Sequence, residues 1–229
     1  MRNLIISIII VASGIMLYPL LQGFTGNEKL SELADFYAQP ENIQKVNSAN
    51  LVTAVVVTYR GLDTMGEVTI LFLTAAIIAF FLKKQSEVRN LRTNSEIFTT
   101  ASKLLIPITV LVGVYIFVNG HLSPGGGFQG GAVIASAVIL LLLAFPDKPF
   151  NHRFFGFMES VSGLVFVLLA VLGAVVGSGY LVNAILPLGT FGKLLSAGAI
   201  PVIYSFVGLK VGAELSSIIS EFRTAQSGD

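Results

Sequence analysis

Apolar residues in this chain gather into long runs, separated by stretches in which charged and polar residues dominate. Since about 20 apolar residues carry an α-helix across a bilayer, runs near this length predict transmembrane helices. The predicted helices occupy residues 3–21, 64–82, 104–118, 127–145, 154–176 and 194–213. We therefore predict an all-α polytopic membrane protein with about six transmembrane helices.

Two polar connections divide the chain. Residues 23–50 form the one sizeable extramembrane connection, and residues 83–103 form a connector with five Lys or Arg residues. We predict that this basic connector separates two modules, residues 1–90 with two transmembrane helices and residues 91–229 with four. Residues 51–59 are apolar but too short to span, so they form an interfacial helix, a re-entrant segment or the start of a broken helix.

The distribution of cations predicts the orientation. With six spans and cytoplasmic termini, nine Lys or Arg residues lie on the inner side and four on the outer side, while Lys210 lies within a span. The excess of inner cations favours this orientation. The first apolar run is long for a signal peptide and lacks a small-residue cleavage site at residues 18–21, so we expect it to be retained as a helix.

Composition supports a membrane protein and excludes several classes of site. Of the 229 residues, 54% are hydrophobic and 12% charged, against about 25% charged residues in soluble domains. The mean hydropathy is +0.81. The absence of Cys excludes disulfides, iron–sulfur clusters and thiolate metal sites built from this chain alone, and two His argue against a self-contained zinc site. The net charge of +1 gives no case for nucleic-acid binding.

A glycine-rich turn between two apolar runs is the most distinctive sequence feature. Residues 120–131 read GHLSPGGGFQGG, with six glycines that allow positive φ angles and close approach of neighbouring helices. Gly125, Gly127 and Gly130 also satisfy the G-x-G-x-x-G spacing of dinucleotide-binding loops. The flanking segments are uncharged and of membrane length, rather than a strand and an amphipathic helix, so the sequence argues against nucleotide binding.

Charged residues inside or beside the predicted spans are the candidates for function, because each is costly in the bilayer unless it has a partner or a use. Asp63 and Glu67 lie four residues apart and share a helix face, with Arg60 as a neutralising neighbour. They line an ion path or simply complement the helix dipole. Glu159 caps its helix from the cytoplasmic side or lines an aqueous pathway.

Lys210 and His121 complete the ionisable candidates. Lys210 and Glu214 form an i, i+4 pair that we expect at the inner end of the last span, where the lysine anchors the helix by snorkelling. His121 relays protons or satisfies backbone groups beside the glycine turn. No nucleophile–base pair or metal-binding set can be assembled, so we expect no cofactor and no enzymatic activity apart from that of a larger complex.

Small residues and prolines predict details of helix packing. Gly173 and Gly177, and likewise Gly208 and Gly212, are spaced for close helix crossing in the fifth and sixth spans. Pro107 and Pro201 are expected to free backbone carbonyls within their spans.

Two motifs in the second module resemble a known family. Residues 120–131, together with residues 189–214 (GTFGKLLSAGAIPVIYSFVGLKVGAE), resemble the MnhB (MrpB) family, a small component of Mrp-type multisubunit sodium/proton antiporters. The four-span form of that family corresponds roughly to residues 96–222. The resemblance implies that His121, Pro124 and Phe128 shape a helix junction at a subunit interface, together with the glycines Gly125, Gly126, Gly127, Gly130 and Gly131.

The first module resembles the MbhE-type segment found at the end of the large antiporter subunit and in membrane-bound hydrogenases. The motif is residues 50–67, NLVTAVVVTYRGLDTMGE, which departs from the pattern at Thr58, where an acid is expected. The resemblance implies Glu67 as the best candidate for a functional carboxylate, with Asp63 and Arg60 as its electrostatic setting. Cation binding in this chain is put in doubt by the departure at Thr58.

Both resemblances imply a small subunit of a sodium/proton antiporter complex in the cell membrane of a prokaryote. Its partners are then other antiporter subunits and the lipid bilayer, and the transported ions are Na⁺ and H⁺. Two alternatives remain at this point: the equivalent subunit of a redox-driven complex such as a membrane-bound hydrogenase, or a purely structural subunit whose acids pair locally.

Overall fold

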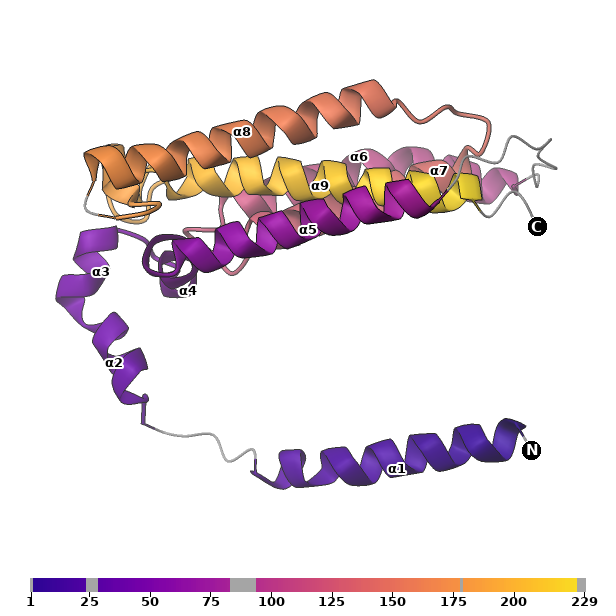
Figure 1. Ribbon diagram of the computed structural model, residues 1–229, viewed down its shortest axis with the longest axis horizontal. Helices are drawn as coiled ribbons and strands as arrows, with labels where there is room; N and C mark the ends of the chain where they lie inside the picture. Colours follow the sequence, from indigo (N-terminus) through magenta and orange to yellow (C-terminus); the bar gives the residue numbers. More distant parts are fainter. Residues whose placement is uncertain (1, 24–28, 83–93, 178, 226–229) are drawn as a thin grey trace. The chain divides into compact units, whose positions relative to one another are not determined.

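The computed structural model describes residues 2–23, 29–82, 94–177 and 179–225 (Figure 1). Within these ranges the regular structure is helical throughout and includes no strand. The chain divides into two units, Met1–Phe36 and Tyr37–Asp229.

The first unit consists mainly of helix α1, Arg2–Gly23. Its position matches the first predicted helix, and Pro19 lies inside it. Helix α2, Glu32–Ala38, begins in this unit, where the Ser31 hydroxyl accepts a hydrogen bond from the Ala34 N–H at 3.3 Å. The described part of α1 includes an apolar stretch at Ile9–Pro19, so a membrane crossing by α1 remains a prediction.

The second unit contains the remaining helices. They are α3 (Pro40–Val46), α4 (Leu51–Ala54), a π-helix (Val55–Tyr59), α5 (Gly61–Phe81), α6 (Glu96–Val118), α7 (Gly127–Ala144), α8 (His152–Val176), a 3₁₀ helix (Asn183–Ile185) and α9 (Ile200–Ala225). Of the described helices, the five from α5 to α9 are long and apolar enough to cross a membrane. The prediction of an all-α polytopic membrane protein is confirmed, and the number of six spans was approximate.

Helix α9 is the central element of the second unit. It packs against α5, α6, α7 and α8, and Figure 1 shows it running between α8 and α5. Its side chains Ile203, Val207 and Val211 are buried in the core beside Phe166 of α8. Of the apolar stretch of α9, 56% is buried, against 11% of that of α5, so the outer helices keep most of their apolar surface exposed.

Glycines bring α7 and α9 into backbone contact. A Cβ atom on Gly131 of α7 would lie 2.7 Å from the Gly208 carbonyl oxygen and 2.9 Å from the Gly212 nitrogen. The predicted close crossing at Gly208 and Gly212 is therefore confirmed. The prediction for Gly173 and Gly177 is wrong, because a Cβ on Gly173 would meet backbone atoms of residues 179–182. These two glycines instead let the loop after α8 fold back onto the helix.

The last helix begins later than predicted, at Ile200 instead of residue 194. Gly189, Gly192 and Gly198 have positive φ angles of 65°, 77° and 59°, which interrupt a helical path before α9. Pro201 consequently lies in the first turn of α9, where its missing N–H leaves no intrahelical acceptor unpaired. The expectation that Pro201 frees a carbonyl within the membrane is wrong, whereas Pro107 lies inside α6 as predicted.

The basic connector is shorter than predicted. Its residues 83–93 lie outside the described residues, but Glu96 to Lys103 already belong to α6. The Ser95 hydroxyl accepts a hydrogen bond from the Phe98 N–H at 3.3 Å and so caps the helix. Lys103 is therefore a helical residue rather than part of a loop.

Residues 51–59 form the first part of a broken helix. Helix α4 runs into the π-helix, the backbone breaks at Arg60 (φ −118°, ψ 33°), and α5 begins at the next residue. The Thr64 hydroxyl donates to the Val56 carbonyl at 2.9 Å and ties the two parts together. Of the three alternatives for this segment, the backbone agrees with the broken helix.

Candidate functional site

Polar side chains just before and within α4 hold the first part of the glycine turn, which we define as residues 119–126. The Asn50 amide donates to the carbonyls of Gly120 and Ser123, each at 2.9 Å. The Ser48 hydroxyl donates to the His121 carbonyl at 3.0 Å, and the Thr53 hydroxyl donates to the Gly120 carbonyl at 2.6 Å. Residues of the first predicted module therefore fix the backbone of the turn in the second.

His121 is fully buried within this arrangement. Its Nε2 lies 3.4 Å from the Lys193 carbonyl oxygen, and its Nδ1 has no hydrogen-bond partner among the described residues. Burial lowers the pKa of His121, although the nearby backbone groups of Lys193, Leu194 and Val118 oppose the shift. The imidazole is consequently neutral near pH 7. A neutral ring can make a structural contact with the backbone, and it can also accept a proton.

Stability is expected to depend on the protonation of His121. In the unfolded chain its pKa returns to about 6.5, so between this value and the lowered native pKa the unfolded state binds more protons. The contribution of neutral His121 is complete above pH 6.5 or so and is lost as the pH falls below that value. The melting temperature in detergent, measured between pH 7.5 and 5.5, should fall less in His121→Gln than in the wild type.

His152→Gln is the matched control for that series, because the His152 side chain is 44% exposed. This variant leaves His121 in place and should keep the loss of stability at low pH that His121→Gln lacks. An identical pH dependence in His121→Gln and the wild type would contradict the assignment to His121.

Tyr204 of α9 connects the glycine turn with the first module. Cβ atoms on Gly120 and Gly126 would lie 2.6 Å and 3.3 Å from its ring, and its hydroxyl interacts with the Thr53 side chain. The charge of Glu67 on α5 acts on the Tyr204 phenol. Glu67 itself is exposed on the surface of the chain.

The predicted partner of Asp63 is in place. The Arg60 guanidinium donates from Nε to Asp63 Oδ2 at 2.6 Å, and the two side chains are 66% and 54% exposed. Asp63 also falls in the first turn of α5, where a carboxylate is favoured by the helix dipole. The structure thus places Arg60, Asp63 and Glu67 together at the start of α5, on an exposed face.

The glycine turn is a junction between α6 and α7. Gly125 has a φ of 156°, and a Cβ atom there would lie 3.0 Å from the Ile116 carbonyl oxygen, so this position requires glycine. The later glycines serve close packing instead: Gly126 faces Tyr204, Gly127 faces Val207, Gly130 faces Gly113 and Phe117, and Gly131 faces Gly208 and Val211. Phe128 packs against the core, whereas Pro124 is exposed.

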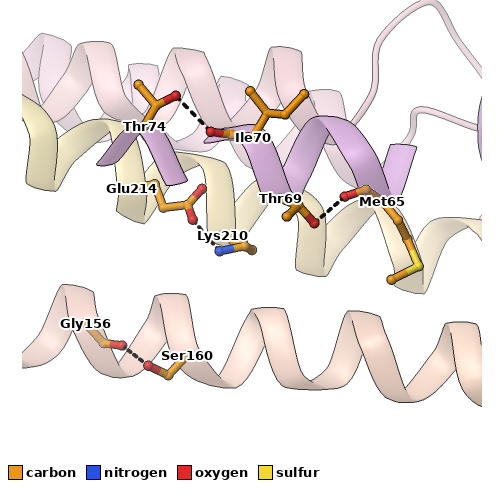
Figure 2. Close-up of polar contacts among 8 residues, drawn as sticks. All are labelled: Met65, Thr69, Ile70, Thr74, Gly156, Ser160, Lys210 and Glu214. Carbon is orange, nitrogen blue, oxygen red and sulfur yellow. Dashed lines mark hydrogen bonds and ion pairs between the residues drawn. The ribbon is translucent and has the colours of Figure 1, made fainter. Parts of the chain in front are cut away.

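Lys210 and Glu214 lie near the middle of α9, not at its inner end. The Lys210 ammonium donates to Glu214 Oε1, and the two side chains are 8% and 0% exposed (Figure 2). The expectation of a snorkelling anchor is wrong because α9 starts six residues later than predicted and continues to Ala225. The pair is a buried ion pair inside a membrane-spanning helix.

Glu159 of α8 belongs to the surroundings of this pair. It is half-buried, and its charge acts on Glu214. One helical turn further along α8, a Cβ on Gly163 would lie 3.6 Å from the Cδ and Cε atoms of Lys210. Figure 2 shows the pair on α9 with α5 on one side and Ser160 of α8 on the other. Glu159, Lys210 and Glu214 therefore form one cluster, which we call the buried charge cluster.

Comparisons with known proteins place the chain beside antiporter subunits. A family model described as a domain related to the MnhB subunit of a Na⁺/H⁺ antiporter matches residues 97–217. A second model, MbhE, which describes the E component of MBH, matches residues 1–102.

Among the relatives found by sequence, one matches about three quarters of each chain, and antiporter subunits match shorter stretches. The chain is 34% identical over 197 residues to an uncharacterized protein of Methanocaldococcus jannaschii, covering 73% of this chain and 74% of that protein. It is 47% identical over 57 residues to the B component of a Na⁺/H⁺ antiporter of Bacillus subtilis, covering 25% of this chain and 40% of the relative. A putative antiporter subunit mnhB2 of Staphylococcus aureus is 37% identical over 103 residues, covering 45% and 64%.

Two solved structures have the same fold. One is a chain of the membrane-bound sulfane sulfur reductase, an archaeal respiratory membrane complex, with a TM-score of 0.77 and 36% identity over 97% of this chain and 98% of that one. The other is a chain of the Mrp complex from Dietzia sp., with a TM-score of 0.69 and 21% identity. This match covers 96% of our chain but 26% of the Dietzia chain.

Proposed function

This chain belongs to the MnhB family of antiporter-related subunits, and on that premise we propose that it is a small membrane subunit of a multisubunit cation/proton antiporter module. It contributes to the ion path and to subunit packing, with Na⁺ and H⁺ as the transported ions, and has no enzymatic activity of its own. The observation that carries this proposal is the succession of an MbhE region and an MnhB region in one chain. We place the boundary between the two modules near residue 90.

The exposed apolar surface supports a role within a larger complex. In α5, α6 and α8, 11%, 17% and 22% of the apolar stretches are buried within this chain. Their remaining surface must face lipid or the helices of other subunits, because water is excluded from the bilayer core. An ion path is then completed by groups of neighbouring subunits.

A specific observation favours one kind of assembly. The likeness to the archaeal respiratory complex extends over 98% of the matched chain, whereas the likeness to the Mrp complex covers about a quarter of a longer chain. The fused arrangement of this protein therefore has a full-length counterpart in a respiratory complex. We propose as the second candidate that its antiporter module belongs to a redox-driven complex.

The described cations support the proposed orientation. Lys148 and Arg153 lie in and after the loop between α7 and α8, and Arg223 of α9 donates to the Pro146 carbonyl at the same end. We propose that this end is cytoplasmic, that both termini are cytoplasmic, and that the protein is a multi-pass component of a prokaryotic cell membrane.

Replacing Glu67 tests the proposed contribution to the ion path. We expect Glu67→Gln to reduce sodium-dependent proton flux about tenfold or more, because the amide cannot exchange a proton, while the complex still assembles. The flux is measured in liposomes containing the purified complex, with an imposed Na⁺ gradient and an internal pH dye. Thr74→Val on the same helix, where the hydroxyl donates to the Ile70 carbonyl at 2.8 Å, is the control. Unchanged flux in assembled Glu67→Gln would favour a purely structural subunit.

A further inference from the structure

The buried charge cluster lies where charges are most costly in a membrane protein. Lys210 and Glu214 are near the middle of a 26-residue helix, and both are buried. Ionisable groups at such depth persist when they are paired or used. Pairing accounts for Lys210 and for one oxygen of Glu214.

The second oxygen of Glu214 is not accounted for by pairing. Oε2 is buried and has no hydrogen-bond partner among the described residues, although a carboxylate can accept several hydrogen bonds. A buried polar atom without a partner calls for an explanation, and a proton-binding role is one.

One additional proton would bring the net charge of the cluster to zero. Glu159 acts electrostatically on Glu214, and it lies one turn of α8 before Gly163, which faces the Lys210 side chain. With all three groups ionised, the cluster carries a net charge of −1 inside the membrane.

A groove connects the cluster with the surface of the chain. It has a volume of about 170 Å³ and is lined by residues of α5, α8 and α9, among them Thr69, Phe72, Gly163 and Lys210. Its other lining residues, Met65, Val68, Phe166 and Val167, are apolar, so water in the groove would be held by Thr69 and the Lys210 ammonium. The Lys210 Nζ lies 5.0 Å from the centre of the Phe72 ring, a cation–π contact inside the groove.

We propose that Lys210, Glu214 and Glu159 form a proton-exchange site, reached through the groove between α5 and α8. A proton passes along the existing hydrogen bond when the Lys210 Nζ–H bond breaks and a Glu214 Oε1–H bond forms, which leaves a neutral amine and a neutral acid. A proton arriving through the groove restores the ammonium, and Glu214 releases its proton to the Glu159 carboxylate. Glu159 then passes its proton toward the His152 end of α8, about two turns away.

This inference rests on the proposed antiporter function, and removal of the whole pair tests it. Replacing a buried ion pair by apolar residues of similar size is often tolerated. The variant K210M/E214M is therefore expected to assemble like the wild type but to lose at least about tenfold of its sodium-driven proton flux in the liposome assay. Ser160→Ala, next to Glu159 on α8 with its hydroxyl bonded to the Gly156 carbonyl, should leave the flux unchanged.

The outcomes separate the two proposals. An active wild type with equally active, assembled K210M/E214M would overturn the proton-exchange site and leave the antiporter function standing. An assembled wild-type complex without any sodium-driven proton flux would overturn both. If K210M/E214M does not assemble, Glu159→Gln decides: a tenfold loss of flux supports the site, and full flux overturns it.

Discussion

Replacing Gly131 with valine is expected to prevent stable folding of the second unit. A Cβ atom at this position would lie 2.7 Å from the Gly208 carbonyl oxygen, 2.8 Å from Val211 Cβ and 2.9 Å from the Gly212 nitrogen. Two of these atoms belong to the backbone of α9, so the whole helix must move. Since overpacking costs about 1–3 kcal/mol even where side chains can adjust, we expect a loss of roughly 3 kcal/mol or more.

The melting temperature of the detergent-purified chain, followed by gel filtration after heating, measures this effect. Gly156→Ala on α8 is the matched control, because an added Cβ there meets no atom within 4 Å. Alanine should be neutral or slightly stabilising at that position, owing to its higher helix propensity. Equal melting temperatures for Gly131→Val and Gly156→Ala would contradict the close crossing of α7 and α9.

Removing one member of the buried ion pair is expected to be far more damaging than removing both. Glu214→Ala leaves the Lys210 ammonium buried without its carboxylate, and breaking such a pair costs about 3–5 kcal/mol in soluble proteins. K210M/E214M removes both charges and should remain near the stability of the wild type. The measurement is again the melting temperature, compared among the two variants and the wild type.

The exposed ion pair of α5 provides the control for this comparison. Arg60 and Asp63 are 66% and 54% exposed, whereas Lys210 and Glu214 are 8% and 0% exposed. Because exposed pairs contribute about 1 kcal/mol or less, Asp63→Ala should change the melting temperature little. If Glu214→Ala lowers the melting temperature no more than Asp63→Ala does, the pair on α9 is not a buried one.

The helices could be predicted from the sequence because the length of an apolar run determines whether it can span. The start of α9 could not, since residues 194–199 are mostly small or apolar and read as part of a span. The break depends on backbone angles such as the φ of 63° at Ala197, and an alanine gives no indication of a left-handed backbone. Together with the continuation of α9 to Ala225, that shift of six residues puts Lys210 and Glu214 in the middle of α9 rather than at the expected helix end.

Candidate residues were found where the signal was a charge within an apolar run, as for Glu159, Lys210 and the Arg60–Asp63 pair. Sequence reasoning paired Glu214 with Lys210 but took the pair as an anchor, and it did not connect Glu159 with it because α8 and α9 meet only in the fold. Tyr204 and Asn50 lie within the two family motifs, residues 189–214 and 50–67, but were not singled out as site residues. Their roles depend on contacts with the glycine turn, about 70 or more positions away along the chain, and a tyrosine or asparagine carries no distinctive pattern.

Co-purification tests the central claim, membership of a multisubunit antiporter module, most directly. The chain is tagged at its C-terminus, extracted from native membranes in mild detergent, and the intact particle is analysed by mass spectrometry. We predict that antiporter-like subunits co-purify in fixed proportion, with redox subunits in the same particle if the respiratory assembly is the correct one. Recovery of the chain alone, from membranes in which it is stably produced, would contradict the account.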